Sequence, residues 1–347
     1  MGAITNALRT VLDGIYAILG NYGWSIVIFT ILIKAVLLPF DFKSRKGMRK
    51  MQRIQPEINA LQKKYANDKQ KLQQKQAELM KREKYNPMAG CLPMLLTLPV
   101  LYAMFGAMRV IANEQTVRHV FEYLSGSKPT FDSWLWVRNI WMPDSPFATM
   151  VPDINSLRMI GFDVWQRVFE TLKPEQVELI LQNIGTQVAD FGGALSFVSA
   201  DALNASLPHI LTTLNTMPEY VSMLQPIPGW ANLSFVLFTV TLYQNFNGFL
   251  ILPALAGATQ VLATKLNPAA DPSAASNAAS GNKGGSANFM KYFFPMFSVF
   301  ICLTSNAGFA LYWVVTNIVA SASSVMITRY YDAKDAKELA NKGDVSV

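Results

Sequence analysis

The residue that most needs a chemical explanation is Lys34, which lies inside the apolar stretch 24–40. That stretch is long enough to cross a bilayer, and an ammonium group is costly within hydrocarbon. Two explanations are open. Either the lysine stem reaches the inner headgroups, near Asp41, or the ammonium group lines a water-filled cavity inside the protein.

Other polar side chains also occur in apolar stretches. Thr30 lies one helical turn from Lys34, and later stretches contain Thr97, Tyr102, Gln260, Thr264, Tyr312, Thr316, Asn317 and Ser321. These groups are reasonable if they line the same wet cavity. Those near the C-terminus are equally reasonable as hydrogen-bonding contacts between helices.

Enzyme chemistry has little support in the sequence. Every carboxylate lies outside the apolar stretches, His119 and His209 are far apart, and the HExxH, GxSxG and paired-carboxylate motifs are missing. An ion-coupled transporter would need intramembrane Asp or Glu, which these stretches lack. We therefore expect no catalytic activity, no metal site and no cofactor.

The composition indicates an integral membrane protein. Of the 347 residues 51% are hydrophobic, and they are gathered into long runs. The net charge of +7 is unevenly placed, which is typical of membrane topology rather than nucleic-acid binding. Cys91 and Cys302 lie in separate apolar runs, which predicts no disulfide, and residues 1–21 lack the pattern of a cleavable signal peptide.

The charge distribution predicts five membrane spans, with the N-terminus outside and the C-terminus in the cytoplasm. Residues 1–23 form an amphipathic helix, which either lies in the interface or extends the first span at a tilt. The predicted spans are 24–40, 91–111, 249–266, 289–304 and 309–328. The segments between and after them are 41–85, 112–248, a flexible cytoplasmic loop at 267–288, and the tail 329–347.

The cytoplasmic segment 41–85 contains 14 Lys and Arg against 5 Asp and Glu. Its apolar residues predict a helical hairpin that turns at Asn67 and Asp68, with Pro56 starting or kinking a helix. The first helix contributes Met51, Ile54, Ile58, Leu61 and Tyr65 to the apolar contact between the two helices, and the second helix contributes Leu72, Leu79 and Met80. A charge run is usually only solvated, but beside a membrane it also favours contact with anionic lipid or ribosomal RNA.

The segment 112–248 is predicted to be an extracytoplasmic helical insert. From Arg109 to Gly248 there are 7 basic and 12 acidic residues, opposite in balance to segment 41–85. One helix should begin at Pro174, and another should be capped by Ser199 or Asp201. Residues 233–243 form an apolar run of doubtful length for a further span.

Several motifs resemble the YidC-type insertases of bacteria, which are relatives of the mitochondrial Oxa and chloroplast Albino insertases. They cover the chain from residue 20 to 331 but not the insert, and the Asn-Pro-x-x-Gly-Cys-x-Pro element is quite specific. The matching stretches are GNYGWS at 20–25, Lys34 before Pro39, MQRIQP at 51–56, NPMAGCLP at 86–93, ILPALAG at 251–257 and GFALYWVVTN at 308–317.

The resemblance implies an all-α membrane protein whose five helices surround a hydrophilic groove, open to the cytoplasm and to lipid. It also implies insertion of nascent membrane proteins without nucleotide hydrolysis, alone or with the Sec translocon. The implied groove residues are Lys34, Thr30, Gln260, Tyr312, Trp313 and Asn317. The basic hairpin, with Arg49, Lys50, Arg53, Lys63 and Lys64, is implied to recruit the substrate and the ribosome or translocon.

The sequence departs from this family in three places. The family usually has arginine where this chain has Lys34, and lysine retains the charge but loses the planar fork of donors. The segment 147–246 is larger than a simple outer loop, and a large N-terminal outer domain is not expected, as in Gram-positive forms. A small-solute transporter or channel is the alternative, weakened by the missing carboxylates and repeats. A purely structural assembly factor would share the topology.

Overall fold

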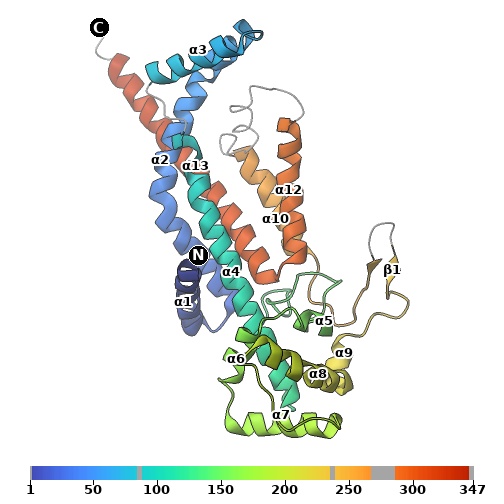
Figure 1. Ribbon diagram of the computed structural model, residues 1–347. Helices are drawn as coiled ribbons and strands as arrows, with labels where there is room; N and C mark the ends of the chain where they lie inside the picture. Colours follow the sequence, from blue (N-terminus) through green and yellow to red (C-terminus); the bar gives the residue numbers. More distant parts are fainter. Residues whose placement is uncertain (1, 84–87, 235–238, 267–285, 344–347) are drawn as a thin grey trace. The chain divides into compact units, whose positions relative to one another are not determined.

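The structure is a computed structural model that describes residues 2–83, 88–234, 239–266 and 286–343 (Figure 1). These residues are mostly helical, and they include a two-stranded antiparallel sheet. The helices are α1 (Gly2–Leu19), α2 (Tyr22–Lys64), α3 (Lys69–Arg82), α4 (Met88–Leu124), α5 (Ile154–Leu157), α6 (Phe162–Phe169), α7 (Pro174–Gln187), α8 (Ala200–Thr216), α9 (Pro218–Met223), α10 (Ile251–Leu266), α12 (Ser286–Thr304) and α13 (Ala307–Gly343); the strands are β1 (Leu233–Ser234) and β2 (Thr239–Val240).

The chain forms two compact units, which we describe separately. Unit 1 comprises Met1–Val27, Ala103–Ala254 and Phe300–Tyr312. Unit 2 comprises Ile28–Tyr102, Leu255–Val299 and Trp313–Val347. The polar residues singled out by the sequence fall almost entirely in unit 2.

Among the described residues, two helices contain stretches long and apolar enough to cross a membrane, namely Tyr22–Gly47 of α2 and Ala307–Lys337 of α13. Two further apolar helical stretches, Ile251–Leu266 and Tyr292–Thr304, are shorter. Both long helices continue past the ends of the predicted spans. A helix can extend into polar sequence after its apolar stretch has ended. Pro56 lies inside α2 and does not start a helix.

The helices of unit 2 expose apolar side chains. Val36 of α2 is 70% exposed and Met296 of α12 is 72% exposed. Further exposed residues follow helical spacing along the same helices, at Ile28, Ile31, Leu32 and Phe40 on α2 and at Tyr292, Phe293 and Phe297 on α12. Such continuous apolar faces are typical of helices that contact lipid.

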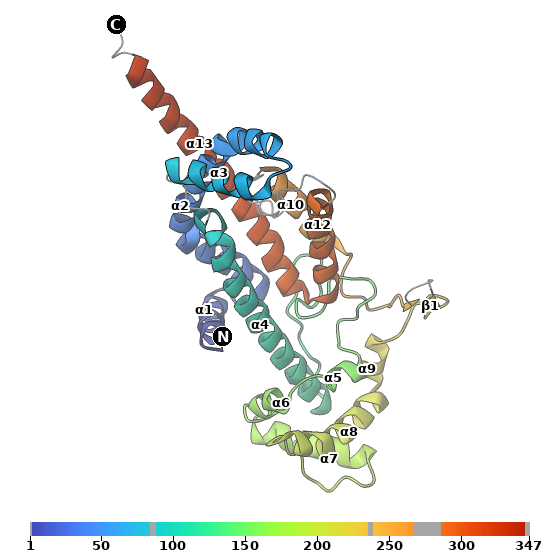
Figure 2. The ribbon, with the colours of Figure 1, turned by 45° about the horizontal axis from the view of Figure 1, so that its top comes forward.

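A glycine permits the close approach of two helices in unit 2. A β-carbon on Gly257 of α10 would lie 2.6 Å from the side chain of Val299 on α12. Figures 1 and 2 both show these helices side by side. Small residues at helix contacts allow this packing within a membrane.

The predicted basic hairpin is present in unit 2. Helix α2 ends at Lys64, and Asp68 begins α3 by accepting a hydrogen bond from the backbone N–H of Lys71. Ile54, Ile58 and Leu79 form a small buried cluster between the two helices, against which Leu61 packs. This part of the sequence prediction is confirmed at the level of secondary structure and packing.

The insert of unit 1 has its own apolar core. Helices α6, α7 and α8 gather around the end of α4, as Figure 2 shows. Pro174 stands at the start of α7, and Ser199 caps α8 through the backbone N–H of Ala202, so both predicted starts are confirmed. Trp165 is fully buried, with its ring stacked 5.8 Å from that of Phe197.

Two features of the insert were not evident from the sequence. The predicted span 91–111 lies within a longer helix, because α4 continues to Leu124, and Val117, Phe121 and Leu124 are buried in the insert core. The apolar run 233–243, of doubtful length for a span, contains the paired antiparallel strands β1 and β2.

The two ends of the insert are held together. Asn247 accepts a hydrogen bond from the Asn139 backbone N–H at 2.7 Å and donates to three backbone carbonyls. The Asp144 carboxylate accepts from the backbone N–H groups of Phe249 and Leu252, at 2.8 and 2.7 Å. A side chain on Gly248 would collide with Asp144, so the glycine is required. These contacts fix the start of α10.

Candidate functional site

The candidate site is the set of polar residues within the apolar helices of unit 2. Thr30 of α2 is buried at 1% exposure, and Lys34 follows it by one turn and is half-buried. Gln260 of α10 and Trp313 and Asn317 of α13 are also half-buried residues of this unit. Five of the six predicted groove residues therefore belong to one compact unit, and Tyr312 is a buried residue of unit 1.

A carboxylate lies two helical turns beyond Lys34 on the same helix. Asp41 interacts electrostatically with Lys34 and with Arg45. The three residues are seven and four positions apart, which places them on one side of α2. The negative charge of Asp41 therefore reduces the net positive charge that Lys34 presents to any other group.

Several polar side chains of α10 and α13 form hydrogen bonds with a neighbouring helix or with their own helix. The Asn317 amide donates to Thr259 Oγ1 at 3.3 Å, and Ser324 donates to the Leu266 carbonyl at 3.2 Å. Ser321 and Thr264 donate to carbonyls of their own helices at 2.7 and 2.8 Å. For these residues the interpretation as contacts that join or stabilise helices fits the structure.

Thr316 differs from its neighbours. Its Oγ1 is buried and has no hydrogen-bond partner among the described residues. A buried hydroxyl without a partner is costly unless water or a ligand reaches it. Thr316 is thus the group of α13 that best fits a hydrated interior.

Three arginines of α2 form a stripe that faces α13. Arg45, Arg49 and Arg53 follow each other at intervals of four residues, which is one turn of helix. Arg45 donates to Ser324, Arg49 donates to Asp332, and Arg53 donates to Asp335 at 2.7 Å. Two of the predicted recruitment residues, Arg49 and Arg53, are therefore ion-paired within the protein.

The other predicted recruitment residues differ in their surroundings. Lys63 and Lys64 are exposed at the end of α2, and the Lys64 ammonium group lies 5.7 Å from the centre of the Tyr65 ring. Lys50 is half-buried. Arg82 of α3 bonds to Glu57 of α2 at 2.5 Å, which ties the two arms of the hairpin together. Among the predicted recruitment lysines, the exposed ones are therefore Lys63 and Lys64, at the end of α2.

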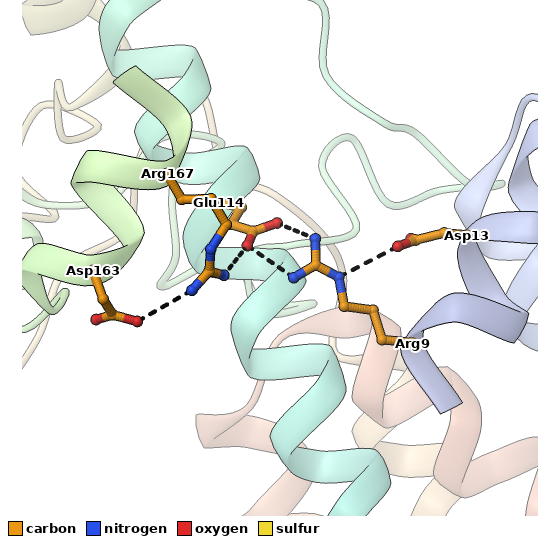
Figure 3. Close-up of polar contacts among 5 residues, drawn as sticks. All are labelled: Arg9, Asp13, Glu114, Asp163 and Arg167. Carbon is orange, nitrogen blue, oxygen red and sulfur yellow. Dashed lines mark hydrogen bonds and ion pairs between the residues drawn. The ribbon is translucent and has the colours of Figure 1, made fainter. Parts of the chain in front are cut away.

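Unit 1 contains an ion network that the sequence analysis missed (Figure 3). The buried Glu114 carboxylate accepts from Arg9 at 2.9 and 2.5 Å and from Arg167 at 2.5 Å. Each arginine also pairs with a carboxylate on its own helix, Asp13 for Arg9 and Asp163 for Arg167, both at 3.3 Å. The network joins α1, α4 and α6.

This network explains the polar face of α1. Arg9 and Asp13 turn toward Glu114, while Ile4, Val11 and Ile18 are exposed at seven-residue intervals. The two pairs at i and i+4 were visible in the sequence as Arg9–Asp13 and Asp163–Arg167. Their meeting at Glu114 depends on the tertiary fold, for which the sequence has no local signal.

The two histidines pack against aromatic rings in the insert. The His119 ring lies 4.9 Å from that of Phe131, and the His209 ring lies 5.5 Å from that of Phe191. Burial lowers the pKa of His119 to about 4, although a hydrogen bond with the Thr130 backbone favours the charged form. Within the described part of the chain, no three His, Cys, Asp or Glu side chains are grouped to hold a metal ion.

Comparison with known proteins identifies a family to which the chain is similar. The family described as 60Kd inner membrane protein matches residues 14–189 and 202–335, which is well over half of the chain. The chain belongs to this family. The resemblance to the YidC-type insertases is thereby confirmed, and the chain is a mostly helical membrane protein.

Three relatives illustrate the similarity, and each is named membrane protein insertase YidC. The protein of Fusobacterium nucleatum is 45% identical over 119 residues, which is 34% of this chain and 51% of the relative. That of Clostridium perfringens is 36% identical over 133 residues, or 38% and 50%. That of Beijerinckia indica is 38% identical over 163 residues, or 46% and 25%. The matches thus span about half of the first two relatives and a quarter of the third.

Proposed function

We propose that this protein is a membrane protein insertase and chaperone that integrates nascent proteins into the lipid bilayer. It acts alone or beside the Sec translocon and without nucleotide hydrolysis. The observation that carries the proposal is the half-buried Lys34 beside the buried Thr30, in a unit whose helices expose apolar faces. The family membership and the names of the relatives support the same function.

The proposed arrangement has five membrane helices around a hydrophilic groove, with the N-terminus outside and the C-terminus in the cytoplasm of a bacterial cell. The groove is lined by Lys34, Thr30, Gln260, Trp313 and Asn317, and Tyr312 is proposed to complete it. Thr316, whose hydroxyl has no hydrogen-bond partner in the described part of the chain, supports the presence of water within this set.

Charge attraction and apolar burial have separate roles in this mechanism. The Lys34 ammonium group attracts an acidic outer segment of the substrate and lowers the cost of its entry into the membrane. The apolar segment that follows then moves into lipid, where each Leu, Ile, Phe or Val contributes about 0.3–0.6 kcal/mol. Because Asp41 interacts with Lys34, substrate carboxylates compete with an internal one.

The first test compares Lys34→Ala with Lys34→Arg in proteoliposomes. The substrates are two versions of one nascent membrane protein, with an acidic or a neutral outer segment. We expect Lys34→Ala to reduce insertion of the acidic version about tenfold, as for loss of one partly desolvated charge contact, and Lys34→Arg to retain it. Lys265→Ala, which removes an exposed lysine at the end of α10, is the matched control.

Full insertion of the acidic version by Lys34→Ala would contradict the proposed role of this charge. Photo-crosslinking from positions 30 and 313 to ribosome-bound nascent chains tests the groove itself. Adducts with membrane proteins are expected, and none with a soluble nascent chain. Solute flux through the same proteoliposomes, without adducts, would favour a channel instead.

A further inference from the structure

The arginine stripe on α2 has a feature that insertion does not explain. Arg49 and Arg53 are held by two aspartates near the end of α13, and the pairs are Arg49–Asp332 and Arg53–Asp335. Arg49 also approaches Asp335 at 3.5 Å and donates to the Thr328 carbonyl at 3.4 Å. The stripe therefore bridges two acidic residues that are one turn apart.

These ion pairs are open to competition from a ligand. Each pair joins a largely exposed side chain, Arg53 at 70% and Asp332 at 60%, to a less exposed one, Asp335 at 34% and Arg49 at 26%. Exposed ion pairs stabilise a protein only weakly, since water screens them and long side chains lose freedom. The two non-bridging oxygens of a phosphodiester can accept two parallel hydrogen bonds from a guanidinium group, as the two oxygens of an aspartate carboxylate can.

The position of the stripe favours a lipid as the source of that phosphate. The stretch of α2 that could cross a membrane ends at Gly47, seven residues past the end of the apolar run at Phe40. Arg49 and Arg53 follow Gly47 by two and six residues, about 3 and 9 Å along a helix. Aromatic side chains typical of the membrane interface lie near this part of α2. Tyr331 donates to the Phe42 carbonyl at 3.2 Å, and Tyr330 lies edge-on to Phe42 at 5.7 Å.

We propose that Arg49 and Arg53 bind the phosphate of an anionic lipid headgroup, and that Asp332 and Asp335 occupy these arginines when no such lipid is bound. Lipid binding then releases the end of α13 from the base of the hairpin. Negative lipids concentrate on the cytoplasmic side, where this surface is placed by the proposed function, on which the inference rests.

The test uses the full-length protein in nanodiscs of phosphatidylcholine, alone or mixed one to one with phosphatidylglycerol. Hydrogen exchange of residues 329–337 reports release of α13, and native mass spectrometry counts retained phosphatidylglycerol. We expect exchange to rise about two- to thirtyfold in the mixed nanodiscs, the range that corresponds to two exposed ion pairs.

Two double variants and one control separate the partners. Asp332→Asn with Asp335→Asn should exchange rapidly in both nanodiscs and retain more phosphatidylglycerol. Arg49→Gln with Arg53→Gln should also exchange rapidly in both but retain less. Glu78→Gln removes an exposed pair with Lys75 on α3 and one negative charge, and it should behave like the unmodified protein.

Equal exchange of the unmodified protein in the two nanodiscs would overturn the proposal. Release by inorganic phosphate at matched ionic strength, or by ribosomal RNA but not by phosphatidylglycerol, would also overturn it. Insertion assays in the same nanodiscs keep the two proposals apart. Loss of insertion with an intact lipid response counts against the insertase alone, and the reverse result counts against the lipid site alone.

Discussion

The insert of unit 1 has an aromatic core, whereas the helices of unit 2 carry continuous exposed apolar faces. The insert encloses Trp165 and Phe197 and is built like a water-soluble domain. Unit 2 exposes Val36 and Met296 and buries Thr30 and Ser298. The difference indicates that one chain folds against two solvents, because apolar surface is costly in water and polar surface is costly in hydrocarbon.

The charged residues follow the same division. In unit 1 three carboxylates and two arginines form a network around a buried glutamate. In unit 2 the ion pairs of α2 and α13 lie beyond the apolar stretch of α2 and are more exposed. The first set is suited to holding elements in place, and the second to exchange with other partners.

The largest change in stability is expected when a side chain in the insert core is truncated. Trp165→Ala should lower the free energy of unfolding by about 3–5 kcal/mol, because it opens a cavity among aromatic rings. Denaturant unfolding of the purified protein in detergent micelles measures this loss. Val36→Ala, on an exposed face of unit 2, should cost less than about 1 kcal/mol.

The Trp165→Phe variant tests whether the loss of stability comes from the cavity. The Trp165 indole N–H is buried and has no hydrogen-bond partner among the described residues. Its removal therefore leaves no new unpaired group, and the variant should stay within about 1 kcal/mol of the unmodified protein. Equal losses for Trp165→Ala and Val36→Ala would contradict the comparison.

The second prediction concerns pH. Burial lowers the pKa of His119 to about 4 from its ordinary 6.5. Between these values the unfolded chain binds a proton that the folded insert does not, so stability must fall as the pH falls, by up to about 3 kcal/mol. Above pH 6.5 the contribution is constant.

The His119→Gln variant isolates this effect. Burial raises the pKa values of Glu122 and Asp132, and their titration stabilises the fold as the pH falls. The informative quantity is therefore the difference between the unfolding free energies of the two proteins as a function of pH. A difference that is constant from pH 7 to pH 4.5 would contradict the assignment to His119.

The third prediction addresses the network around Glu114. Glu114→Gln should cost about 1–3 kcal/mol, because two arginines lose a shared, buried carboxylate but keep their exposed partners. Asp13→Asn removes only the outer pair and should cost less than about 1 kcal/mol. Unfolding in micelles measures both, and equal losses would show that burial is not what makes Glu114 important.

The smallest expected change in stability is that of Thr316→Val in unit 2. Because Oγ1 has no partner among the described residues, valine should leave the unfolding free energy within about 0.5 kcal/mol. Insertion should nevertheless decrease if water at this hydroxyl contributes to the groove. Ser321→Ala, whose hydroxyl already bonds to the Asn317 carbonyl, is the control and should insert normally. A stable, fully active Thr316→Val would exclude a wet groove at this residue.

Local signals in the sequence predicted local structure well. Asp68 starts α3, Pro174 starts α7 and Ser199 starts α8 as expected. In each case a side chain or a fixed backbone angle acts within one helical turn, so no tertiary information is needed.

The sequence was less informative about where helices end. Hydropathy marks the limit of an apolar stretch, but α2 and α4 continue for a further 24 and 13 residues past the predicted span ends at 40 and 111. Their later turns are amphipathic and pack against protein. The predicted loop 267–288 lies mostly outside the described residues.

The candidate site was predicted only as a set of residue types. Lys34, Asp41 and Arg45 follow from helical spacing along α2, so their proximity was accessible to the sequence. Asp332 and Asp335 reach α2 across nearly 300 positions of chain, and only the tertiary fold brings them there. Long-range ion pairs leave no periodic pattern, which is why these partners were missed.

The contacts of Asn247 and Asp144 bring residues about 100 positions apart to a single point. The segment between these two residues therefore begins and ends at one place. Because the entropy of closing a loop changes only slowly with its length, the length of this segment can vary at little entropic cost. What must be kept are the insert residues that cover Val117, Phe121 and Leu124 of α4, and the pairing of Arg167 with Glu114.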